Sequence, residues 1–298
     1  MKIDTEKIKS GKSILELLEF WIINIDKPSG PTSFDISDFV RKKLELRKTS
    51  HFGTLDPKVT GVLPIALNRA CKLTGFFLGE NKEYIGIMRV HEEIEIGKLQ
   101  NIINKKFLGK IMQKPPVKSR VKRVEREREI MSFEIIEKDE NGKDFLFRTE
   151  VQGGTYIRKL IDDLGKELGI GAHMLELRRV RAGIFNEDDK EYPAINLYDF
   201  EKAVDEYKEG NEEKLREIII PGELVSELYP SVDVNKESIK KLYNGSPVFL
   251  KDLTDKSKIK DSRVCVFSGD KFIGIYNVIN LGEVFAKPEF VLQPIKWK

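Results

Sequence analysis

Residues 49–66 read TSHFGTLDPKVTGVLPIA and combine turn-forming residues, small residues and one carboxylate. Asp56 directly precedes Pro57, with Gly53 before it and Gly61 after it. A residue before proline is held in an extended or turn conformation, so Asp56 is expected on a rigid loop. Such a carboxylate either closes an Asx-turn with its own backbone or serves as a nucleophile or base at a functional site.

Helices are expected on both sides of this loop. Residues 34–46 place apolar side chains on one helical face, with Thr32 or Ser33 as the N-cap. Residues 156–168 show the same periodicity, with Thr155 in position to cap the helix. Both segments are therefore predicted to pack one apolar face against a core.

Strands are predicted at 82–90 and 143–151. In the second segment the apolar side chains alternate with the period of two that a strand requires. An acidic stretch follows later, with helices predicted at 196–210 and 211–219. After Tyr229 the sequence pattern changes to short apolar segments. These predict a small β-rich module with a helix at 236–245 and strands at 246–250, 263–268 and 271–279.

Charge is distributed unevenly although the formal net charge is only +3. Residues 105–128 hold ten basic and two acidic side chains, whereas residues 201–228 hold four basic and nine acidic ones. The basic run is either a solvated face or a surface for phosphate groups, since clustered Lys and Arg release counterions when they bind nucleic acid. The total charge therefore conceals two unlike segments.

Composition excludes several classes of protein. Two distant cysteines and three scattered histidines cannot supply a disulfide framework or a CxxC or HExxH metal site, and no nucleotide-binding glycine motif is present. No apolar run approaches the roughly 20 residues of a membrane helix, and the N-terminal residues do not form a signal peptide. We therefore expect a reduced, cytoplasmic, soluble protein with no membrane, no metal and no cofactor.

Five segments, in order, carry a family resemblance. They are 23–42 (INIDKPSGPTSFDISDFVRK), 50–67 (SHFGTLDPKVTGVLPIAL), 82–91 (KEYIGIMRVH), 113–123 (QKPPVKSRVKR) and 153–183 (GGTYIRKLIDDLGKELGIGAHMLELRRVRAG). Together they resemble the successive motifs of the pseudouridine synthases of the TruB/dyskerin group, and GTLDPKVTG is closer to the archaeal dyskerin branch. The resemblance implies an α+β fold with a central mixed, mainly antiparallel sheet flanked by helices. It also implies an N-terminal extension (1–21), a catalytic domain (22–228) and a small β-barrel-like PUA domain (229–298).

The resemblance implies isomerisation of uridine to pseudouridine without a cofactor. Asp56 becomes the catalytic aspartate, acting on the ring or sugar or by removing a ribose proton. Arg158 would keep this carboxylate ionised, and Tyr84 would stack on the flipped uracil. The further substrate-binding residues implied are His51, Lys27, Tyr156 and Leu177. Three of the residues also have a structural interpretation: Arg158 as a surface arginine, Tyr84 as a core tyrosine and His51 as a loop histidine.

RNA partners follow from the same resemblance. The target uridine must leave its stack before the glycosidic bond can be reached. In the dyskerin branch a guide RNA of the H/ACA class selects the uridine in ribosomal RNA, and three small accessory proteins complete the particle. A stand-alone tRNA T-loop enzyme and a non-catalytic RNA-binding scaffold are the alternatives. The residues expected to hold phosphates are Lys118, Arg120, Lys122 and Arg123.

Overall fold

A computed structural model describes residues 4–115, 122–255 and 261–294 of the chain. The chain forms two compact units, one from Ser13–Ile220 and one that combines Met1–Lys12 with Pro221–Lys298. The change between these compact units falls at Pro221, and the first twelve residues group with the C-terminal module. The functional division into a catalytic domain (22–228) and a PUA domain (229–298) stays a prediction.

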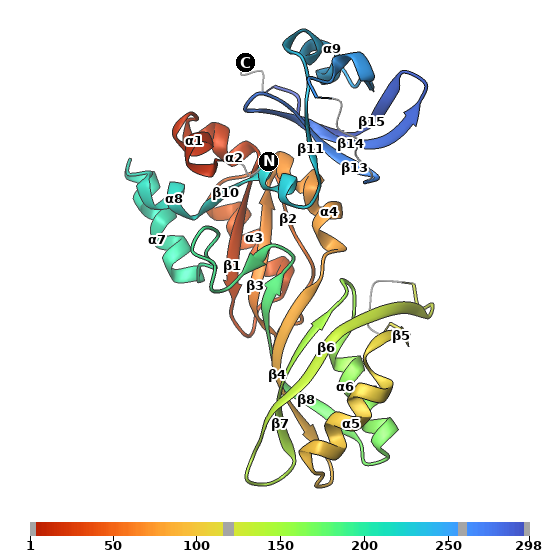
Figure 1. Ribbon diagram of the computed structural model, residues 1–298. Helices are drawn as coiled ribbons and strands as arrows, with labels where there is room; N and C mark the ends of the chain where they lie inside the picture. Colours follow the sequence, from red (N-terminus) through yellow and green to blue (C-terminus); the bar gives the residue numbers. More distant parts are fainter. Residues whose placement is uncertain (1–3, 116–121, 256–260, 295–298) are drawn as a thin grey trace. The chain divides into compact units, whose positions relative to one another are not determined.

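The larger unit is built on a mixed sheet (Figure 1). Most neighbouring strands run antiparallel, and β3 and β8 run parallel where Gly61 lies opposite Arg179. This arrangement confirms the predicted α+β architecture. In the described residues the strand order is β10 (Ile219–Pro221), β1 (Trp21–Lys27), β3 (Thr60–Leu67), β8 (Ala172–Ala182), β4 (Lys82–Val90), β7 (Asp144–Val151), β6 (Arg126–Lys138) and β5 (Gly109–Gln113), with β2 (Thr49–His51) on β3 and β9 (Phe185–Asn186) on β8.

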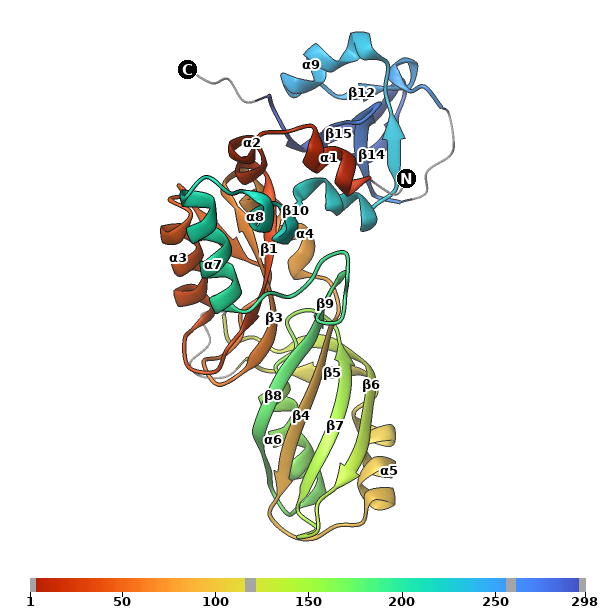
Figure 2. The same cartoon turned by 90° about the vertical axis from the view of Figure 1, so that its left-hand side faces the viewer.

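Helices flank the two halves of this sheet. Figure 2 shows α5 and α6 on one face of the half formed by β4, β6, β7 and β8, while α3 and α7 lie side by side next to β1 and β3. The rings of Phe39 on α3 and Phe200 on α7 meet edge to face, with centroids 6.1 Å apart. The helices of this unit are α2 (Ile14–Glu19), α3 (Ser33–Lys43), α4 (Thr74–Leu78), α5 (Ile96–Lys106), α6 (Ile157–Leu168), α7 (Leu197–Lys208) and α8 (Glu213–Ile218), with a 3-10 helix at Asn68–Leu73.

The beginnings of α3 and α6 differ in how well the sequence predicts them. Thr32 caps α3 as expected, and its hydroxyl and backbone exchange hydrogen bonds with Asp35 in a capping box. The prediction that Thr155 caps α6 is wrong. Tyr156 is the N-cap residue, and the Thr155 hydroxyl instead donates to the carbonyl of Gln152 at 2.8 Å. A preceding turn therefore uses the hydroxyl that the pattern assigned to the helix.

The central strands confirm the predicted alternation. On β7 the side chains of Phe145, Phe147, Thr149 and Val151 are all buried. On β4 every second residue from Lys82 to Val90 is buried. Because successive side chains of a strand point to opposite faces, Lys82 and Tyr84 share one face of the sheet.

The second unit contains a five-stranded sheet over its own apolar core. Its strands follow the order β11 (Ser231–Asp233), β13 (Arg263–Ser268), β14 (Lys271–Leu281), β15 (Val284–Val291) and β12 (Val248–Phe249), and its helices include α1 (Thr5–Ser10) and α9 (Ile239–Tyr243). The predicted turn between β13 and β14 is present and is centred on Gly269 and Asp270. No helix in the described part of either unit is long and apolar enough to cross a lipid bilayer.

Candidate active site

Asp56 lies on the loop between β2 and β3, and hydrogen bonds hold the backbone on both sides of it. The hydroxyl of Ser33 accepts from the amide of Leu55 at 2.8 Å and donates to its carbonyl at 3.0 Å. The amide of Val59 donates to the carbonyl of Asp56 at 3.0 Å. The Asp56 side chain is 47% exposed. The loop is therefore fixed at its backbone while the carboxylate remains accessible to solvent.

Lys27, the last residue of β1, lies under this loop and is fully buried. Its ammonium donates to the carbonyls of Pro28 (2.8 Å), Pro57 (3.0 Å) and Val59 (2.8 Å). Burial lowers the pKa of Lys27, and the negative charge of Asp56 opposes that shift. Lys27 thus holds the loop from below and places a positive charge near the carboxylate.

Arg158 forms an ion pair with Asp56. Its Nη2 lies 2.7 Å from Asp56 Oδ2, and its side chain is 61% exposed. Arg158 is the second residue of α6, directly after the buried Ile157 that anchors the first turn. An exposed pair of this kind adds at most about 1 kcal/mol to stability. Its main effect is to fix the direction of the two side chains.

Tyr84 connects to the same loop through Arg179. The two residues face each other on β4 and β8, where a β-bulge at Val180 brings Arg179 opposite Tyr84. Arg179 donates a hydrogen bond to the Tyr84 side chain, and its Nη2 donates to the carbonyl of Gly53 at 3.1 Å. Burial lowers the pKa of Arg179, and Tyr84 opposes the shift. A buried guanidinium therefore joins β4 to the loop that carries Asp56.

Gly61 allows β3 and β8 to approach closely at this point. Its φ of +100° is favoured only for glycine, and a Cβ there would lie 2.2 Å from the carbonyl oxygen of Arg179. Arg179 also donates to the carbonyl of Val62 at 2.8 Å. The glycine of GTLDPKVTG is thus required by the packing that positions Arg179.

Tyr156 is held by a side chain from a distant strand. Gln113, at the end of β5, accepts from the amide of Tyr156 at 3.0 Å and donates to its carbonyl at 3.2 Å. Gln113 is only 2% exposed. The backbone leading into α6 and Arg158 is therefore anchored to β5.

Leu177 is buried on β8 opposite Gly86. A Cβ on Gly86 would lie 2.9 Å from Leu177 Cδ1.

His51 ends β2 at the base of the loop. Its Nδ1 is buried and has no hydrogen-bond partner in the described part of the chain. Burial lowers the pKa of His51, and the charge of Arg179 lowers it further. The structure therefore favours the neutral imidazole.

The structure brings most of the predicted site together. Lys27, Asp56 and Arg158 interact directly or through the loop backbone, and Tyr84 and His51 connect to them through Arg179. Tyr156 precedes Arg158 by two residues, and Leu177 precedes Arg179 by two. The catalytic and substrate-binding roles of these residues stay predictions.

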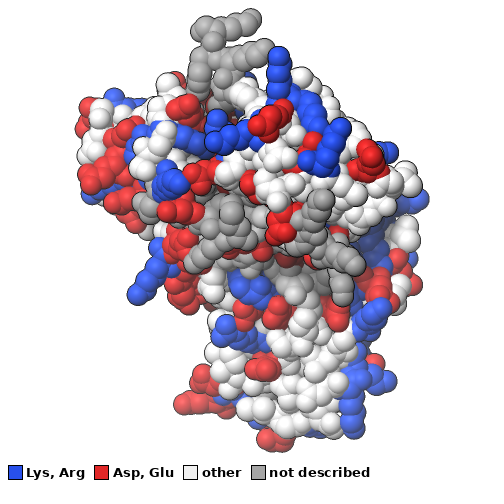
Figure 3. All heavy atoms as spheres, turned by 45° about the horizontal axis from the view of Figure 1, so that its top comes forward, with Lys and Arg blue, Asp and Glu red and all other residues white. Residues whose placement is uncertain are grey.

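The predicted phosphate-binding residues are only partly described. Lys122 and Arg123 are exposed, and Arg123 Nε donates to the carbonyl of Pro115 at 3.3 Å. Lys118 and Arg120 lie outside the described residues. Figure 3 shows one face of the molecule, on which basic and acidic side chains are interspersed. The assignment of these four residues to RNA stays a prediction.

Three buried polar residues of the site were not predicted from the sequence: Ser33, Gln113 and Arg179. The helical pattern indicates Ser33 only as a possible cap. Gln113 stands within the basic segment, whose charge is typical of a solvated surface. Arg179 belongs to the run LELRRVRAG, which contains three arginines. A central strand cannot leave all of them in solvent, so this run was the indication in the sequence of a buried guanidinium.

This arrangement can support chemistry at an accessible carboxylate. A fixed loop presents Asp56, a guanidinium pairs with it, and buried cations lie behind the loop. A carboxylate presented in this way can act as a nucleophile or a base. The described residues contain no group of three or more His, Cys, Asp or Glu side chains able to hold a metal ion.

Comparison with known proteins identifies the class. Residues 41–157 match the family model for the N-terminal domain of the TruB family pseudouridylate synthases, and residues 158–225 match that for the tRNA pseudouridylate synthase B C-terminal domain. Both matches include residues of the site described above. The chain belongs to the TruB family of pseudouridine synthases, enzymes that isomerise uridine in RNA.

Similar curated proteins come from archaea. A "Probable tRNA pseudouridine synthase B" of Methanocaldococcus jannaschii is 42% identical over 83% of this chain and 72% of its own length. The protein of the same name from Archaeoglobus fulgidus is 40% identical over 85% of this chain and 77% of its own length. These relatives confirm the family predicted from the five motifs.

Solved structures place the fold within the archaeal dyskerin branch. A chain of the structure described as "Crystal Structure of a Cbf5-Nop10-Gar1 Complex" superposes with a TM-score of 0.85 and 34% identity, covering 96% of this chain and 89% of the other. A chain of the "archaeal box H/ACA sRNP Nop10-Cbf5 complex" gives 0.83 and 32%, with coverage of 96% and 90%. The similarity therefore includes the C-terminal unit as well as the site.

Proposed function

We propose that this pseudouridine synthase acts on uridines of ribosomal RNA under the direction of an H/ACA guide RNA, as the catalytic subunit of a ribonucleoprotein. The observation that carries the proposal is the similarity to Cbf5 over 96% of the chain. One similar structure is described as an "H/ACA RNP bound to a substrate RNA containing 2'-deoxyuridine", at 33% identity and a TM-score of 0.84. The guide RNA, the substrate RNA and the small accessory proteins are the partners, and the location is the cytoplasm.

Asp56 is the catalytic carboxylate in this proposal. Its loop is held at Leu55, Pro57 and Val59, so the carboxylate meets the flipped nucleoside without reorganisation of the backbone. Arg158 fixes the direction of the Asp56 carboxylate through their ion pair. Tyr84 and Leu177 then contact the uracil ring, and His51, Lys27 and Tyr156 support the substrate pocket.

A second candidate is guide-independent modification of tRNA. The observation that favours it is the name tRNA pseudouridine synthase B, carried by relatives that are 40–44% identical. The two candidates share the chemistry at Asp56 and differ in how the target uridine is selected. They therefore differ in whether conversion depends on a second RNA.

The test is pseudouridine mapping with the purified full chain on a tRNA transcript and on a guide–target RNA pair, each with and without the small accessory proteins. We expect the target uridine to be converted only when the matching guide is present, and a guide with a scrambled pairing segment serves as the control. Conversion of tRNA with no guide stimulation of the paired target would exclude the guided function.

A further inference from the structure

Lys82 is a buried lysine next to the site, and none of the functions above uses it. It is the first residue of β4, two residues before Tyr84 on the same face, and only 4% exposed. Lysine is rarely buried to this extent unless its ammonium is well paired. Its partners therefore indicate what the residue does.

The Lys82 ammonium binds the end of α4. It donates to the carbonyls of Phe77 (3.2 Å), Leu78 (2.9 Å) and Glu80, which lie at the C-terminal end of α4 and in the turn that leads into β4. The last carbonyls of a helix lack partners within the helix and attract positive charge. Lys82 thus supplies a single cationic donor group to two carbonyls at the end of α4 and to one in the turn that follows.

The same turn packs against the segment that leads to Arg158. A Cβ at Gly153 would lie 2.5 Å from the carbonyl oxygen of Leu78 and 2.8 Å from those of Gly79 and Glu80. Only glycine permits so close an approach of two backbones. Gly153 precedes Arg158 by five residues, so a shift of the turn would be transmitted to the start of α6.

On its other side Lys82 reaches the loop that carries Asp56. A Cβ at Gly53 would lie 3.8 Å from Lys82 Cε and 3.3 Å from Arg179 Nη1. Phe77 of α4 also stacks on Phe52, the neighbour of Gly53, with ring centroids 4.5 Å apart. The α4–β4 turn therefore touches the segments that carry both members of the Asp56–Arg158 pair.

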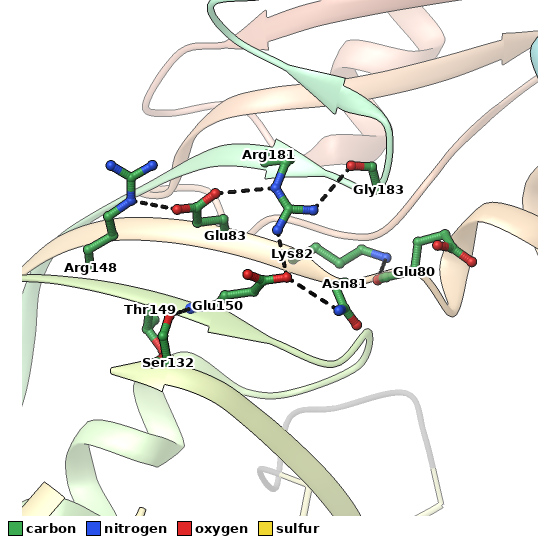
Figure 4. Close-up of polar contacts among 10 residues, drawn as sticks. All are labelled: Glu80, Asn81, Lys82, Glu83, Ser132, Arg148, Thr149, Glu150, Arg181 and Gly183. Carbon is green, nitrogen blue, oxygen red and sulfur yellow. Dashed lines mark hydrogen bonds and ion pairs between the residues drawn. The ribbon is translucent and has the colours of Figure 1, made fainter. Parts of the chain in front are cut away.

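Figure 4 shows how the charged groups around Lys82 are arranged. On the neighbouring positions Glu83 bridges Arg148 and Arg181, and Glu150 pairs with Arg181. In the part of the chain that the structure describes, Lys82 donates only to backbone carbonyls and to no carboxylate. Glu83 and Glu150 are thus paired with arginines rather than with Lys82.

Burial, together with the positive charges of Arg179 and Arg181, lowers the pKa of Lys82 to about 8. The charge of Glu80 opposes this shift. These are the charged groups that face the ammonium from β8 and from the α4–β4 turn. Lys82 consequently loses its proton in a pH range where the protein can be assayed.

We propose that Lys82 is a positioning residue for pseudouridylation: its ammonium holds the α4–β4 turn against both the Asp56 loop and the segment that leads to Arg158. An ammonium offers three N–H donors and matches the three carbonyls, whereas the neutral amine offers two. Deprotonation therefore releases one carbonyl and loosens the contact between the two segments. The inference concerns the isomerisation step and is independent of how the target uridine is selected.

The test measures single-turnover uridine conversion from about pH 6.5 to about pH 9.5, with the RNA on which the unaltered full chain is active. We expect the unaltered protein to lose rate with an apparent pKa near 8. Lys82→Met keeps the apolar stem, so its rate should fall about 10- to 100-fold and lack this basic limb, with RNA affinity within about threefold. Lys72→Met removes an exposed lysine as the control and should retain the basic limb.

Lys82→Arg keeps the charge throughout this range and should shift the basic limb upward by more than about one pH unit. If circular dichroism shows that Lys82→Met does not fold, the pH profile of Lys82→Arg alone tests the proposal. A basic limb near pH 8 that is unchanged in either variant would overturn the proposal, and so would an unaltered rate for Lys82→Met.

Discussion

Arg158 Nη2 lies 2.7 Å from Asp56 Oδ2, and the two residues come from a helix and a loop that are far apart in the sequence. Both side chains are about half exposed or more, so the pair is solvated and free to exchange partners with a nucleotide. The stability of the protein depends little on such a pair. Its function lies in the direction that it gives to the carboxylate.

Arg158→Gln is therefore expected to lower the rate of conversion about 100-fold while changing the free energy of unfolding by less than about 1 kcal/mol. Arg158→Lys keeps the charge but not the planar donor fork, so its rate should lie between those of the unaltered protein and Arg158→Gln. Single-turnover assays and urea unfolding measure the two effects separately. A Gln variant with the rate of the unaltered protein would rule out this role of the ion pair.

Lys27→Met is expected to lower the free energy of unfolding by at least about 2 kcal/mol, because three carbonyls lose a buried donor. Lys58→Met, an exposed neighbour in the same loop, serves as the control and should change stability by less than about 0.5 kcal/mol. Denaturant unfolding measures both.

The stability of the unaltered protein should also depend on pH through Lys27. Its folded pKa is lowered, so above that pKa the unfolded state binds more protons than the folded state. The free energy of unfolding therefore rises with pH toward the ordinary pKa of lysine, and Lys27→Met lacks this rise. An equal rise in both proteins would contradict the assignment.

His51 predicts a pH effect on the acidic side. Its folded pKa lies below the ordinary value of about 6.5, so stability is present above pH 6.5 and is lost as the pH falls through the folded pKa. His51→Gln should lose less stability on acidification than the unaltered protein, measured by unfolding at several pH values. His173→Gln removes an exposed histidine for comparison. Parallel pH curves for the His51 variant and the unaltered protein would reject the prediction.

The basic segment is tested by salt dependence. Replacing Lys118, Arg120, Lys122 and Arg123 together by glutamine should weaken RNA binding and reduce the salt slope by about 0.7 to 0.9 for each phosphate that is no longer neutralised. Replacing Lys202 and Lys208, two exposed lysines of the acidic stretch, by glutamine is the control for a loss of surface charge. Filter binding at several salt concentrations gives both slopes. An unchanged slope would show that this segment does not bind phosphates.

The sequence predicted the elements that depend on local periodicity and on motifs. The helix that begins at Ser33, the strands β4 and β7, and the loop position of Asp56 all follow from apolar spacing or turn chemistry. The pairing of Asp56 with Arg158 was expected only through the family resemblance. No local pattern brings a loop before β3 next to the start of α6.

Contacts made by buried polar groups were beyond sequence reasoning. Arg179 and Lys82 bind backbone carbonyls of other segments, and a carbonyl has no sequence signature. The same holds for Gln113 and Tyr156, where a side-chain amide pairs with a distant backbone. The β-bulge at Val180 further places Arg179, instead of Val180, opposite Tyr84. These features depend on tertiary register rather than on composition.

The most direct test of the account is pseudouridine formation by Asp56→Asn beside the unaltered protein, on the same RNA and under single-turnover conditions. The substitution keeps the size of the side chain and removes the carboxylate that the loop presents. We expect a loss of at least about 1,000-fold with RNA binding retained, whereas Asp38→Asn on the surface of α3 should keep the native rate. Conversion by Asp56→Asn at the native rate would contradict the assignment of Asp56 as the catalytic residue.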